Sequence, residues 1–318
     1  MNNLLINMKL SKILEIGIKN IELIKDGEFN SFALTNGKLK RGNKLIVYIS
    51  SDEYISFIIN NIEINCILCS RDIYEKMKMR KIDSLSKLGI VITDNPRTTF
   101  FLFHNYLNKY TEFYKNDFEN KIDDTAQIHS TCILPKKNIV IGKNVILRPN
   151  VVLYENVWID DNVTIGDGSV IGNPAFYYLD IDEKKVLVDS TGGVKIKRNA
   201  EIHSHAVICR GTLGGMTEIG CNSKIDSHVF LGHDVTIKEN CLLPAGSILA
   251  GGVTLNDNCF VGIGTKIAPL ITVGKNVMIS AGSTVVKNVK DNSHVSGNFA
   301  IDHVKYVNFI RKVSNDKI

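Results

Sequence analysis

Two residues in the second half of the chain have the types and the spacing that acyl transfer requires. His233, in the segment SHVFLGHDV, is followed 18 positions later by Gly251, in LAGGV. A neutral imidazole can accept a proton as a general base, and an unblocked glycine N–H can stabilise an oxyanion. The pair would suit attack by an amine or a hydroxyl on a thioester, provided that the fold brings the two residues together.

A six-residue repeat gives the reason to expect that it does. Aliphatic residues recur every six positions between Ile141 and Val285, with interruptions after Ile171 and Ile208. When the aliphatic residue is position i, position i+4 is Val, Ser, Ala, Cys or Thr in 18 of 19 hexads, and position i+3 is Asn or Gly in 15 of them. Asn and Gly tolerate the left-handed backbone that a tight corner needs.

This period predicts a parallel β-helix. An amphipathic helix would repeat every 3.6 residues and a single strand every two, so neither explains a sustained period of six. Three hexads would close a triangular coil, and successive coils would stack at the sheet spacing of about 4.8 Å. The i and i+4 side chains would point inward, whereas His233, at i+2, would face outward with Gly251 one coil away on the same face.

Three further histidines lie on the middle coils and also avoid the inward positions. His205 and His228 occupy the i+3 corner position, where histidine is tolerated better than most residues, so that structure alone could explain them. His203 is interpreted as a solvated surface residue.

The rest of the chain divides around the repeat. Residues 1–118 mix apolar runs with helical stretches and predict a small α/β domain. Residues 119–298 would form the β-helix, and apolar residues at helical spacing predict a C-terminal helix in 299–318. The excursion 172–193 carries Phe176, Tyr177 and Tyr178, and long loops on rigid scaffolds are commonly functional. We expect these three aromatic residues to border a substrate pocket.

Composition excludes several classes of protein. A net charge of +5 spread along the chain does not indicate nucleic-acid binding, and no apolar run is long enough for a transmembrane segment. The N-terminus has no signal-peptide pattern, and the seven cysteines have no regular spacing, so a cytoplasmic protein is expected. Cys66 and Cys69 form a CxxC motif within an apolar run, which favours buried strand cysteines.

Several segments resemble one known family. IDSHVFLGHDVTIKEN is similar to the IDN…IAHNV…IG.N segment of the UDP-3-O-acylglucosamine N-acyltransferases and of relatives that acylate nucleotide-linked amino sugars. RGTLGG, VSGNFA and ITDNPRTTFFLFHNYL resemble further segments of that family. VYISSDEY resembles its TF..N.KY segment, whose two aromatic residues sandwich the nucleotide base.

The resemblance implies a left-handed β-helix, a homotrimer with active sites between neighbouring subunits, and a role for each matching residue. His233 would be the catalytic base, Gly251 the oxyanion donor, and Tyr48 and Tyr54 the nucleotide-binding pair. The implied reaction is N-acyl transfer from acyl-CoA or an acyl carrier protein to a nucleotide-linked amino sugar, with no tightly bound cofactor and no metal.

Three departures from the family bear on the substrate. NPAFYYLD replaces a glycine-rich DGFGY loop, Asp234 replaces the Asn that follows the base, and a second family histidine has no counterpart. These differences favour a dTDP-4-amino-4,6-dideoxyhexose over the lipid A-pathway substrate, which stays as the alternative.

Two other classes of function remain open at this stage. A metalloenzyme resembling γ-class carbonic anhydrase would use His228 and His233, which are five residues apart as in that family, but its third ligand is not found upstream. A noncatalytic β-helix would leave the outward histidine, the neighbouring glycine and the paired tyrosines unexplained.

Overall fold

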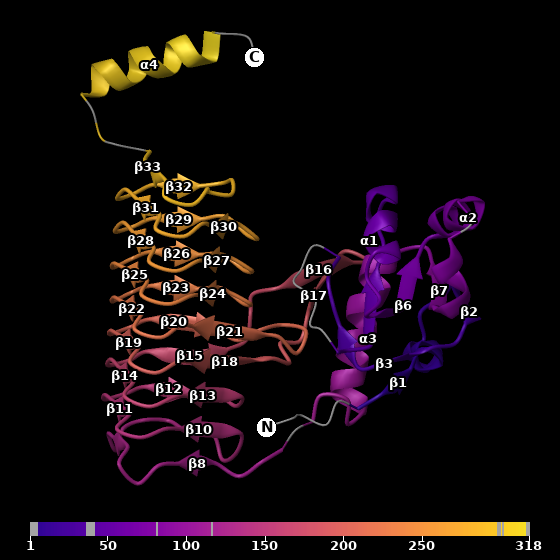
Figure 1. Cartoon of the computed structure of the whole chain (residues 1–318), viewed down its shortest axis with the longest axis horizontal. Helices are drawn as coiled ribbons and strands as arrows, with labels where there is room; N and C mark the ends of the chain where they lie inside the picture. The colour runs from indigo at the N-terminus through magenta and orange to yellow at the C-terminus, as the bar shows by residue number, and fades with distance from the viewer. Residues whose placement is uncertain are drawn as a thin grey trace.

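The computed structural model describes residues 6–35, 42–80, 82–115, 117–297, 300 and 302–315. Figure 1 shows a tall stack of coils, a smaller α/β unit beside the middle of the stack, and helix α4 beyond the last coil. The α/β unit and the coils are joined by the chain that enters the first coil and by an excursion that leaves the middle of the stack.

A five-stranded sheet forms the centre of the α/β unit, in the order β2-β7-β6-β5-β4. Its strands are β2 (Ile21–Lys25), β4 (Ser31–Phe32), β5 (Leu45–Tyr48), β6 (Ile64–Cys69) and β7 (Gly89–Thr93). Strand β2 is antiparallel to β7, and the other neighbours are parallel. The helical elements are η1 (Leu10–Ile16), η2 (Asp52–Tyr54), α1 (Ile55–Ile59), α2 (Arg71–Met79), η3 (Asp83–Lys87) and α3 (Pro96–Tyr110), and β1 (Met8–Lys9) pairs with β3 (Glu28–Phe29).

Both faces of this sheet are covered, which explains why its strands are continuous apolar runs. Cys66 belongs to the core that contains the phenylalanines of α3, and Cys69 belongs to the core on the other face with α1 and α2. Both thiols are fully buried, and burial raises the pKa of each to about 12. The interpretation of Cys66 and Cys69 as buried strand cysteines is therefore confirmed.

The β-helix consists of three parallel sheets. Sheet 1 contains β8 (Lys121–Ile122), β10 (Ile139–Ile141), β13 (Val157–Ile159), β18 (Gly193–Ile196), β21 (Met216–Ile219), β24 (Thr236–Ile237), β27 (Thr254–Leu255) and β30 (Thr272–Val273). Sheet 2 contains β9 (Gln127–Ile128), β11 (Ile146–Leu147), β14 (Thr164–Ile165), β19 (Glu201–Ile202), β22 (Lys224–Ile225), β25 (Leu242–Leu243), β28 (Phe260–Val261), β31 (Met278–Ile279) and β33 (His294–Val295). Sheet 3 contains β12 (Val152–Leu153), β15 (Val170–Asn173), β20 (Val207–Cys209), β23 (Phe230–Leu231), β26 (Ile248–Leu249), β29 (Lys266–Ile267) and β32 (Thr284–Val285).

The phase of the repeat is confirmed by burial and by backbone conformation. The aliphatic i residues and the small i+4 residues together line one continuous core inside the coils. Of the 19 i+3 residues, all but Asn288 take positive φ. They include the four exceptions to the Asn-or-Gly rule, which are His205, His228, Asp234 and Leu270. The predicted left-handed parallel β-helix with a small N-terminal α/β unit and a C-terminal helix is thus the observed fold class.

Each coil has three corners, and we name them by their contents. The ladder corner joins sheet 1 to sheet 2 at Asn144, Asn162, Asn199, Asn222, Asn240, Asn258, Asn276 and Asn292. The histidine corner joins sheet 2 to sheet 3 at Asn150, Gly168, His205, His228, Gly246, Gly264 and Gly282. The insertion corner joins sheet 3 to the next coil of sheet 1 at Asn138, Asn156, Asp234, Gly252 and Leu270, and both interruptions of the repeat leave from it.

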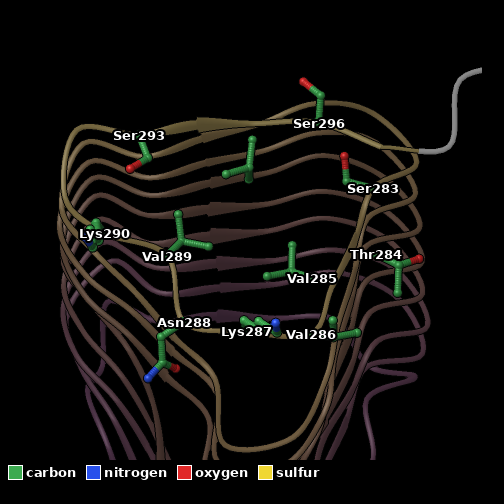
Figure 2. A pocket seen from close by; sticks show the side chains of 11 residues that line it. Ser283, Thr284, Val285, Val286, Lys287, Asn288, Val289, Lys290, Ser293 and Ser296 are labelled. Carbon is green, nitrogen blue, oxygen red and sulfur yellow. The ribbon is translucent and has the colours of Figure 1, made fainter. Parts of the chain in front are cut away.

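The last coil ends in an open cavity of about 350 Å³. Figure 2 shows Val285 and Val289 projecting into the lumen there. Its lining lies within residues 283–296 and includes none of the predicted site residues. Beyond it, α4 (His303–Asn315) exposes Val304, Tyr306 and Phe309. Residues 298, 299, 301 and 316–318 of the region predicted to lead into and form the C-terminal helix lie outside the described residues.

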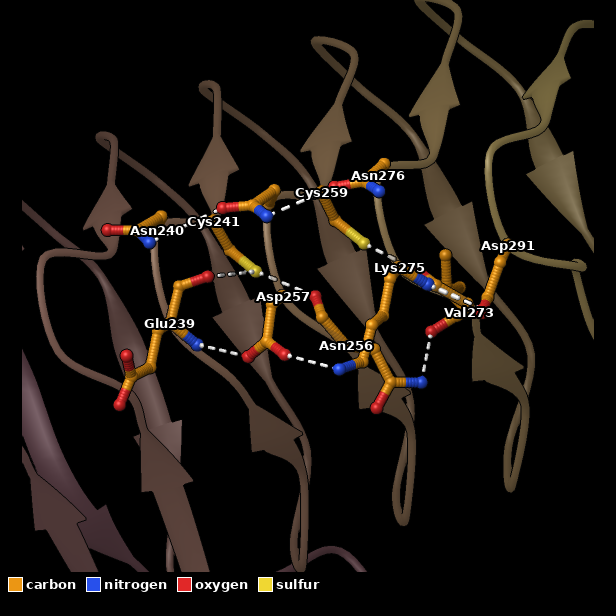
Figure 3. Close-up of polar contacts among 12 residues, drawn as sticks. Glu239, Asn240, Cys241, Asn256, Asp257, Cys259, Val273, Lys275, Asn276 and Asp291 are labelled. Atoms are coloured by element: carbon orange, nitrogen blue, oxygen red, sulfur yellow. Dashed lines mark hydrogen bonds and ion pairs between the residues drawn. The ribbon is translucent and has the colours of Figure 1, made fainter.

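Side chains at the ladder corner are hydrogen-bonded from coil to coil. Each asparagine amide donates to the next, from Asn144 through to Asn292, at 2.9–3.3 Å. Figure 3 shows Asn240 and Asn276 in this ladder, with the thiols of Cys241 and Cys259 directed inward to carbonyl oxygens of the following coil. The ladder continues unbroken past both interruptions, so the coils stay in register there.

The excursion 172–193 differs from the loop that the sequence predicted. It contains an antiparallel hairpin of β16 (Tyr178–Ile181) and β17 (Lys184–Leu187), with Asp182 and Glu183 at positive φ in the turn. Leu179 and Val188 are buried in the core shared with α3. The excursion is therefore ordered by packing on the α/β unit, a long-range contact that local sequence does not reveal.

No helix in the described part of the chain is long and apolar enough to cross a membrane. The division of the chain at residue 118 lies between the end of α3 and the first β-helix strand, β8. It remains a prediction as a domain boundary.

Candidate active site

His233 and Gly251 lie against each other at the insertion corner. The parallel register pairs Leu231 with Leu249, which stacks the two corners that follow them. A Cβ added to Gly251 would lie 2.4 Å from His233 Nε2, so the imidazole covers the space that any larger residue would occupy. Gly251 does not have positive φ, and its need for glycine therefore comes from the ring and not from the backbone.

The neighbouring Asp234 determines which ring nitrogen is available. Its Oδ2 is 2.9 Å from His233 Nδ1. Because a carboxylate only accepts hydrogen bonds, a neutral His233 carries its proton on Nδ1 and leaves the lone pair on Nε2, the atom beside Gly251. This is the tautomer that a general base needs.

Asp234 is itself held by Thr212, from the second interruption of the repeat. The Thr212 hydroxyl donates to Asp234 Oδ2 at 2.8 Å, and the Thr212 N–H donates to the same oxygen at 3.1 Å. Burial alone would raise the pKa of Asp234, but the hydrogen bonds from His233 and Thr212 outweigh it and hold that pKa below its usual value. The carboxylate therefore stays ionised beside the imidazole.

Tyr177 covers the face of His233. The two rings are parallel within 5°, with their centroids 5.7 Å apart. Tyr177 belongs to the excursion, and its hydroxyl accepts a hydrogen bond from Arg97 Nη2 at 3.4 Å. The excursion thus joins the β-helix site to the N-terminus of α3.

Aromatic contacts continue from Tyr177 to the predicted nucleotide-binding residues. Phe101 packs edge-on against Tyr177 at 5.2 Å between centroids and lies 6.2 Å from the ring of Tyr48. Tyr48 ends β5, and Tyr54 follows in η2. Burial is the main cause of the raised pKa of Tyr48, and Tyr54 lies near enough to contribute to it. A series of ring contacts therefore connects the predicted base to Tyr48, with Tyr54 close to Tyr48.

The other two aromatic residues of the excursion do not reach His233. Phe176 is 91% exposed and Tyr178 is 43% exposed, and they pack edge-on against each other at 5.1 Å. Alternate residues of an extended segment point to opposite sides, so that Tyr177 faces inward and its two neighbours face outward. Of the three residues expected to border a pocket, the structure brings only Tyr177 to the predicted base.

The remaining histidines form a separate group. His205 and His228 stack at 5.3 Å between centroids at the histidine corner, on another edge of the coils. His228 thus contacts His205 and not His233. Among the described residues, no group of three or more His, Cys, Asp or Glu side chains could hold a metal ion. The pairing of His228 with His233 that the carbonic-anhydrase hypothesis needs is not observed.

Two residues of this site were missed in the sequence. Thr212 lies within RGTLGG, and Arg97 stands in NPR where the resembling family has NPY. The guanidinium of Arg97 lies 5.9 Å from the Phe101 ring centroid and beside the hydroxyls of Tyr48 and Tyr177. The departure from a tyrosine to an arginine was the signal available at this position.

Comparison with known proteins finds similarity to hexapeptide-repeat transferases. Residues 138–173 match the family model described as bacterial transferase hexapeptide (six repeats). A UDP-3-O-acylglucosamine N-acyltransferase from Gloeobacter violaceus is 50% identical over 127 residues, which cover 40% of this chain and 36% of that protein. One from Bradyrhizobium diazoefficiens is 46% identical over 63 residues, which cover 20% of this chain and 18% of that protein. The matched region therefore spans well under half the length of these relatives.

Solved structures give weaker similarity. LpxA from Acinetobacter baumannii has 23% identity and a TM-score of 0.48, covering 62% of this chain and 77% of that one. Perosamine N-acetyltransferase from Caulobacter crescentus has 12% identity and a TM-score of 0.21, covering 82% and 85%. The resemblance to hexapeptide-repeat acyltransferases predicted from the sequence is confirmed by the family model and by the names of the curated relatives.

Proposed function

We propose that this protein is an N-acyltransferase that moves an acyl group from a thioester to the amine of a nucleotide-linked amino sugar. The observation that carries the proposal is the arrangement of His233 between Asp234 and Gly251. It provides a base with a defined free nitrogen next to a backbone N–H. Acyl transfer to an amine needs both.

The reaction follows from these positions. His233 Nε2 accepts a proton from the amine as its nitrogen attacks the thioester carbonyl carbon, and the Gly251 N–H donates to the oxygen that becomes negative. When the tetrahedral intermediate collapses, the C–S bond breaks, and the thiolate leaves with the proton from His233. Asp234 stabilises the imidazolium between these steps. A single oxyanion donor typically contributes about 10²–10³ in rate.

The nucleotide would bind at the α/β unit. Tyr48 and Tyr54 would stack on the base, with stacking worth about 1–3 kcal/mol per base. Arg97 lies between this pair and His233, and no carboxylate is within ion-pair distance of it in the described part of the chain. We assign Arg97 to the diphosphate that connects base and sugar, because a guanidinium matches phosphate oxygens well.

The identity of the sugar is proposed from the positions at which the site differs from the resembling family. Tyr177 on His233, Arg97 and Asp234 all differ from what the resembling family carries, which favours a dTDP-4-amino-4,6-dideoxyhexose. A UDP-3-O-acylglucosamine acceptor is the second candidate, since the curated relatives bear that name. The acyl donor would be acyl-CoA or an acyl carrier protein, with no tightly bound cofactor. All seven cysteines are free, which supports a cytoplasmic location.

A homotrimer is part of the proposal. Exposed apolar residues form stripes on both sheets that flank the histidine corner: Phe230 and Ile248 on sheet 3, and Leu242, Phe260 and Met278 on sheet 2, each 37–50% exposed. Two different apolar faces meeting at one edge suit a cyclic assembly, in which face packs on unlike face. Light scattering of the purified protein should give three times the monomer mass, and a monomer would exclude this assembly.

The test of the function is turnover of a panel of amino-sugar nucleotides with acyl-CoAs, followed by mass spectrometry. The expected product is the sugar nucleotide with one acyl group on nitrogen, together with stoichiometric free thiol. The panel should contain dTDP- and UDP-linked sugars, each with and without the amine. If the hydroxyl analogues are acylated as readily as the amines, the assignment to N-acyl transfer is wrong.

A further inference from the structure

A buried histidine far from the reacting atoms is connected to the site through residues of the excursion. His104 of α3 is fully buried, and its Nε2 is 2.9 Å from the carbonyl oxygen of Asp189. Burial is the main cause that lowers the pKa of His104 to about 4, so that it is neutral at ordinary pH. Because a carbonyl oxygen only accepts, Nε2 carries the proton, and Nδ1 accepts a hydrogen bond from the Tyr114 hydroxyl at 2.6 Å.

The next links lie in the two interruptions of the repeat. The Tyr114 hydroxyl, which donates to His104, lies beside the side chain of Thr191 at the end of the excursion. The Thr191 hydroxyl and N–H both donate to the Thr212 carbonyl oxygen at 2.8 Å. Thr212 in turn donates to Asp234, which holds His233. A path of hydrogen bonds and side-chain contacts therefore runs from α3 through both insertions to the imidazole.

Further α3 side chains hold the same stretch of the excursion. Asn105 donates to the Leu187 carbonyl oxygen at 2.7 Å and accepts from the Asp189 N–H at 2.9 Å, and Asn108 donates to the Asp189 carboxylate at 2.9 Å. The path passes through the Thr212 backbone between its carbonyl and its hydroxyl. It therefore cannot carry a proton, but it can transmit position.

We propose that His104 and Tyr114 are positioning residues, which fix the Asp234–His233 pair through Thr191 and Thr212. The base takes its reactive orientation only when α3 is seated against the excursion. This inference rests on the proposed function of His233 as the base. In chemical terms, the neutral imidazole of His104 and the phenol of Tyr114, both in the α/β unit, would control the tautomer and the ring orientation of His233 on the β-helix.

The variants Tyr114→Phe and Thr212→Val test the path with little change in packing. Thr212→Val removes the hydroxyl that bonds Asp234, and we expect kcat to fall roughly 10- to 100-fold, with KM changed by less than about twofold. Tyr114→Phe acts further away and should lower kcat roughly 3- to 10-fold. Thr212→Ser keeps the hydroxyl and should restore kcat. The double variant should lose little more than Thr212→Val alone, because both changes act through the same carboxylate.

Thr217→Val is the matched control. Thr217 is equally buried on β21, and its hydroxyl has no hydrogen-bond partner among the described residues. It should leave kcat unchanged. If Tyr114→Phe and Thr212→Val behave like Thr217→Val, or if any loss of kcat only follows a fall in Tm, the positioning role is wrong.

Nitrogen-15 NMR of histidine-labelled protein separates this inference from the proposed function. In the parent protein His233 should show a single tautomer with hydrogen on Nδ1, and in Thr212→Val and Tyr114→Phe a mixture of tautomers. An unchanged His233 signal in both variants would overturn the inference. If the parent acylates no sugar nucleotide, the proposed function fails, and the NMR comparison still decides whether the path positions His233.

Discussion

The ladder corner and the insertion corner share one backbone and differ in what their side chains do. At both, the i+3 residue has positive φ and begins a new sheet. The ladder corner repeats asparagine in every coil, and each amide bonds the next. At the insertion corner the same position holds Asp234, Gly252 and Leu270 in successive coils, with the two long insertions below them.

The difference shows how a repetitive scaffold acquires a site. A ladder satisfies its own polar groups and leaves nothing to bind a substrate. Where the ladder is absent, the carboxylate of Asp234 can orient the neighbouring His233. The insertions can then bring Thr212 to the carboxylate and Tyr177 to the imidazole. The ladder corner keeps the coils in register while the insertion corner departs from the repeat.

The largest expected effect is the replacement of the base. His233→Ala should lower kcat by roughly 10²–10⁴, because it removes a general base without touching the core. The acyl-transfer rate, measured at saturating concentrations of both substrates, checks this. His205→Asn is the control, since it places the usual residue at a positive-φ corner on another edge. It should leave the rate unchanged, and an equal loss in both variants would point to a general effect on the coils.

Alanine at Gly251 should lower kcat roughly 10- to 100-fold with little loss of stability. The new Cβ would lie 2.4 Å from His233 Nε2 and would displace the ring, and small displacements of a catalytic group are costly. Gly246→Ala is the matched control at the histidine corner, where φ is +68° and no atom lies within 4 Å of a new Cβ. It should cost about 1–2 kcal/mol of stability and no activity. Unchanged kcat in Gly251→Ala would separate Gly251 from the reaction.

Stability should fall as pH decreases because of His104. In the folded protein its pKa is lowered from 6.5 to about 4, so the unfolded chain binds a proton first as the pH falls. The stabilising effect of the neutral form is complete above pH 6.5 and is lost between there and pH 4, by up to about 3 kcal/mol.

Urea unfolding across this pH range measures the effect. His104→Gln does not titrate and should flatten the dependence. His203→Gln, at an exposed histidine, should leave the dependence unchanged. The free energy of unfolding of the parent protein could instead depend on pH no more steeply than that of His104→Gln. That result would mean that α3 does not keep His104 neutral against the excursion.

The smallest effect is expected at the ladder corner. Asn240→Ala removes a donor to Asn258 and an acceptor for Asn222, and it places alanine at φ +56°. We expect a loss of about 1–2 kcal/mol in the free energy of unfolding, with no change in kcat. Asn240→Gly removes the backbone strain and should cost less. A fall in kcat in either variant would show that the two corners are not independent.

The β-helix could be predicted from the sequence because its period is local. Every coil repeats the same requirement for an aliphatic residue, a corner residue and a small residue, so one rule placed His233 outward and Gly251 beside it. His233 and Gly251 could therefore be identified from the repeat alone, without knowledge of contacts between residues far apart in the chain.

The contacts between the α/β unit and the coils could not be predicted in this way. Tyr177 reaches His233, and His104 reaches Asp189, only because the excursion folds back on α3. Residues far apart in the chain meet there, and no periodicity records such pairings. The sequence does not separate Phe176 and Tyr178 from Tyr177, because only the strand geometry of the excursion directs Tyr177 inward and its neighbours outward.

The most direct test of the account is a crystal structure of the His233→Ala variant with an amino-sugar nucleotide and acyl-CoA. The account predicts the base between Tyr48 and Tyr54, the diphosphate at Arg97, and the amine beside the space left by the imidazole, facing Gly251. A nucleotide bound at the α/β unit with its amine directed away from the insertion corner would contradict the claim that the two regions form one active site.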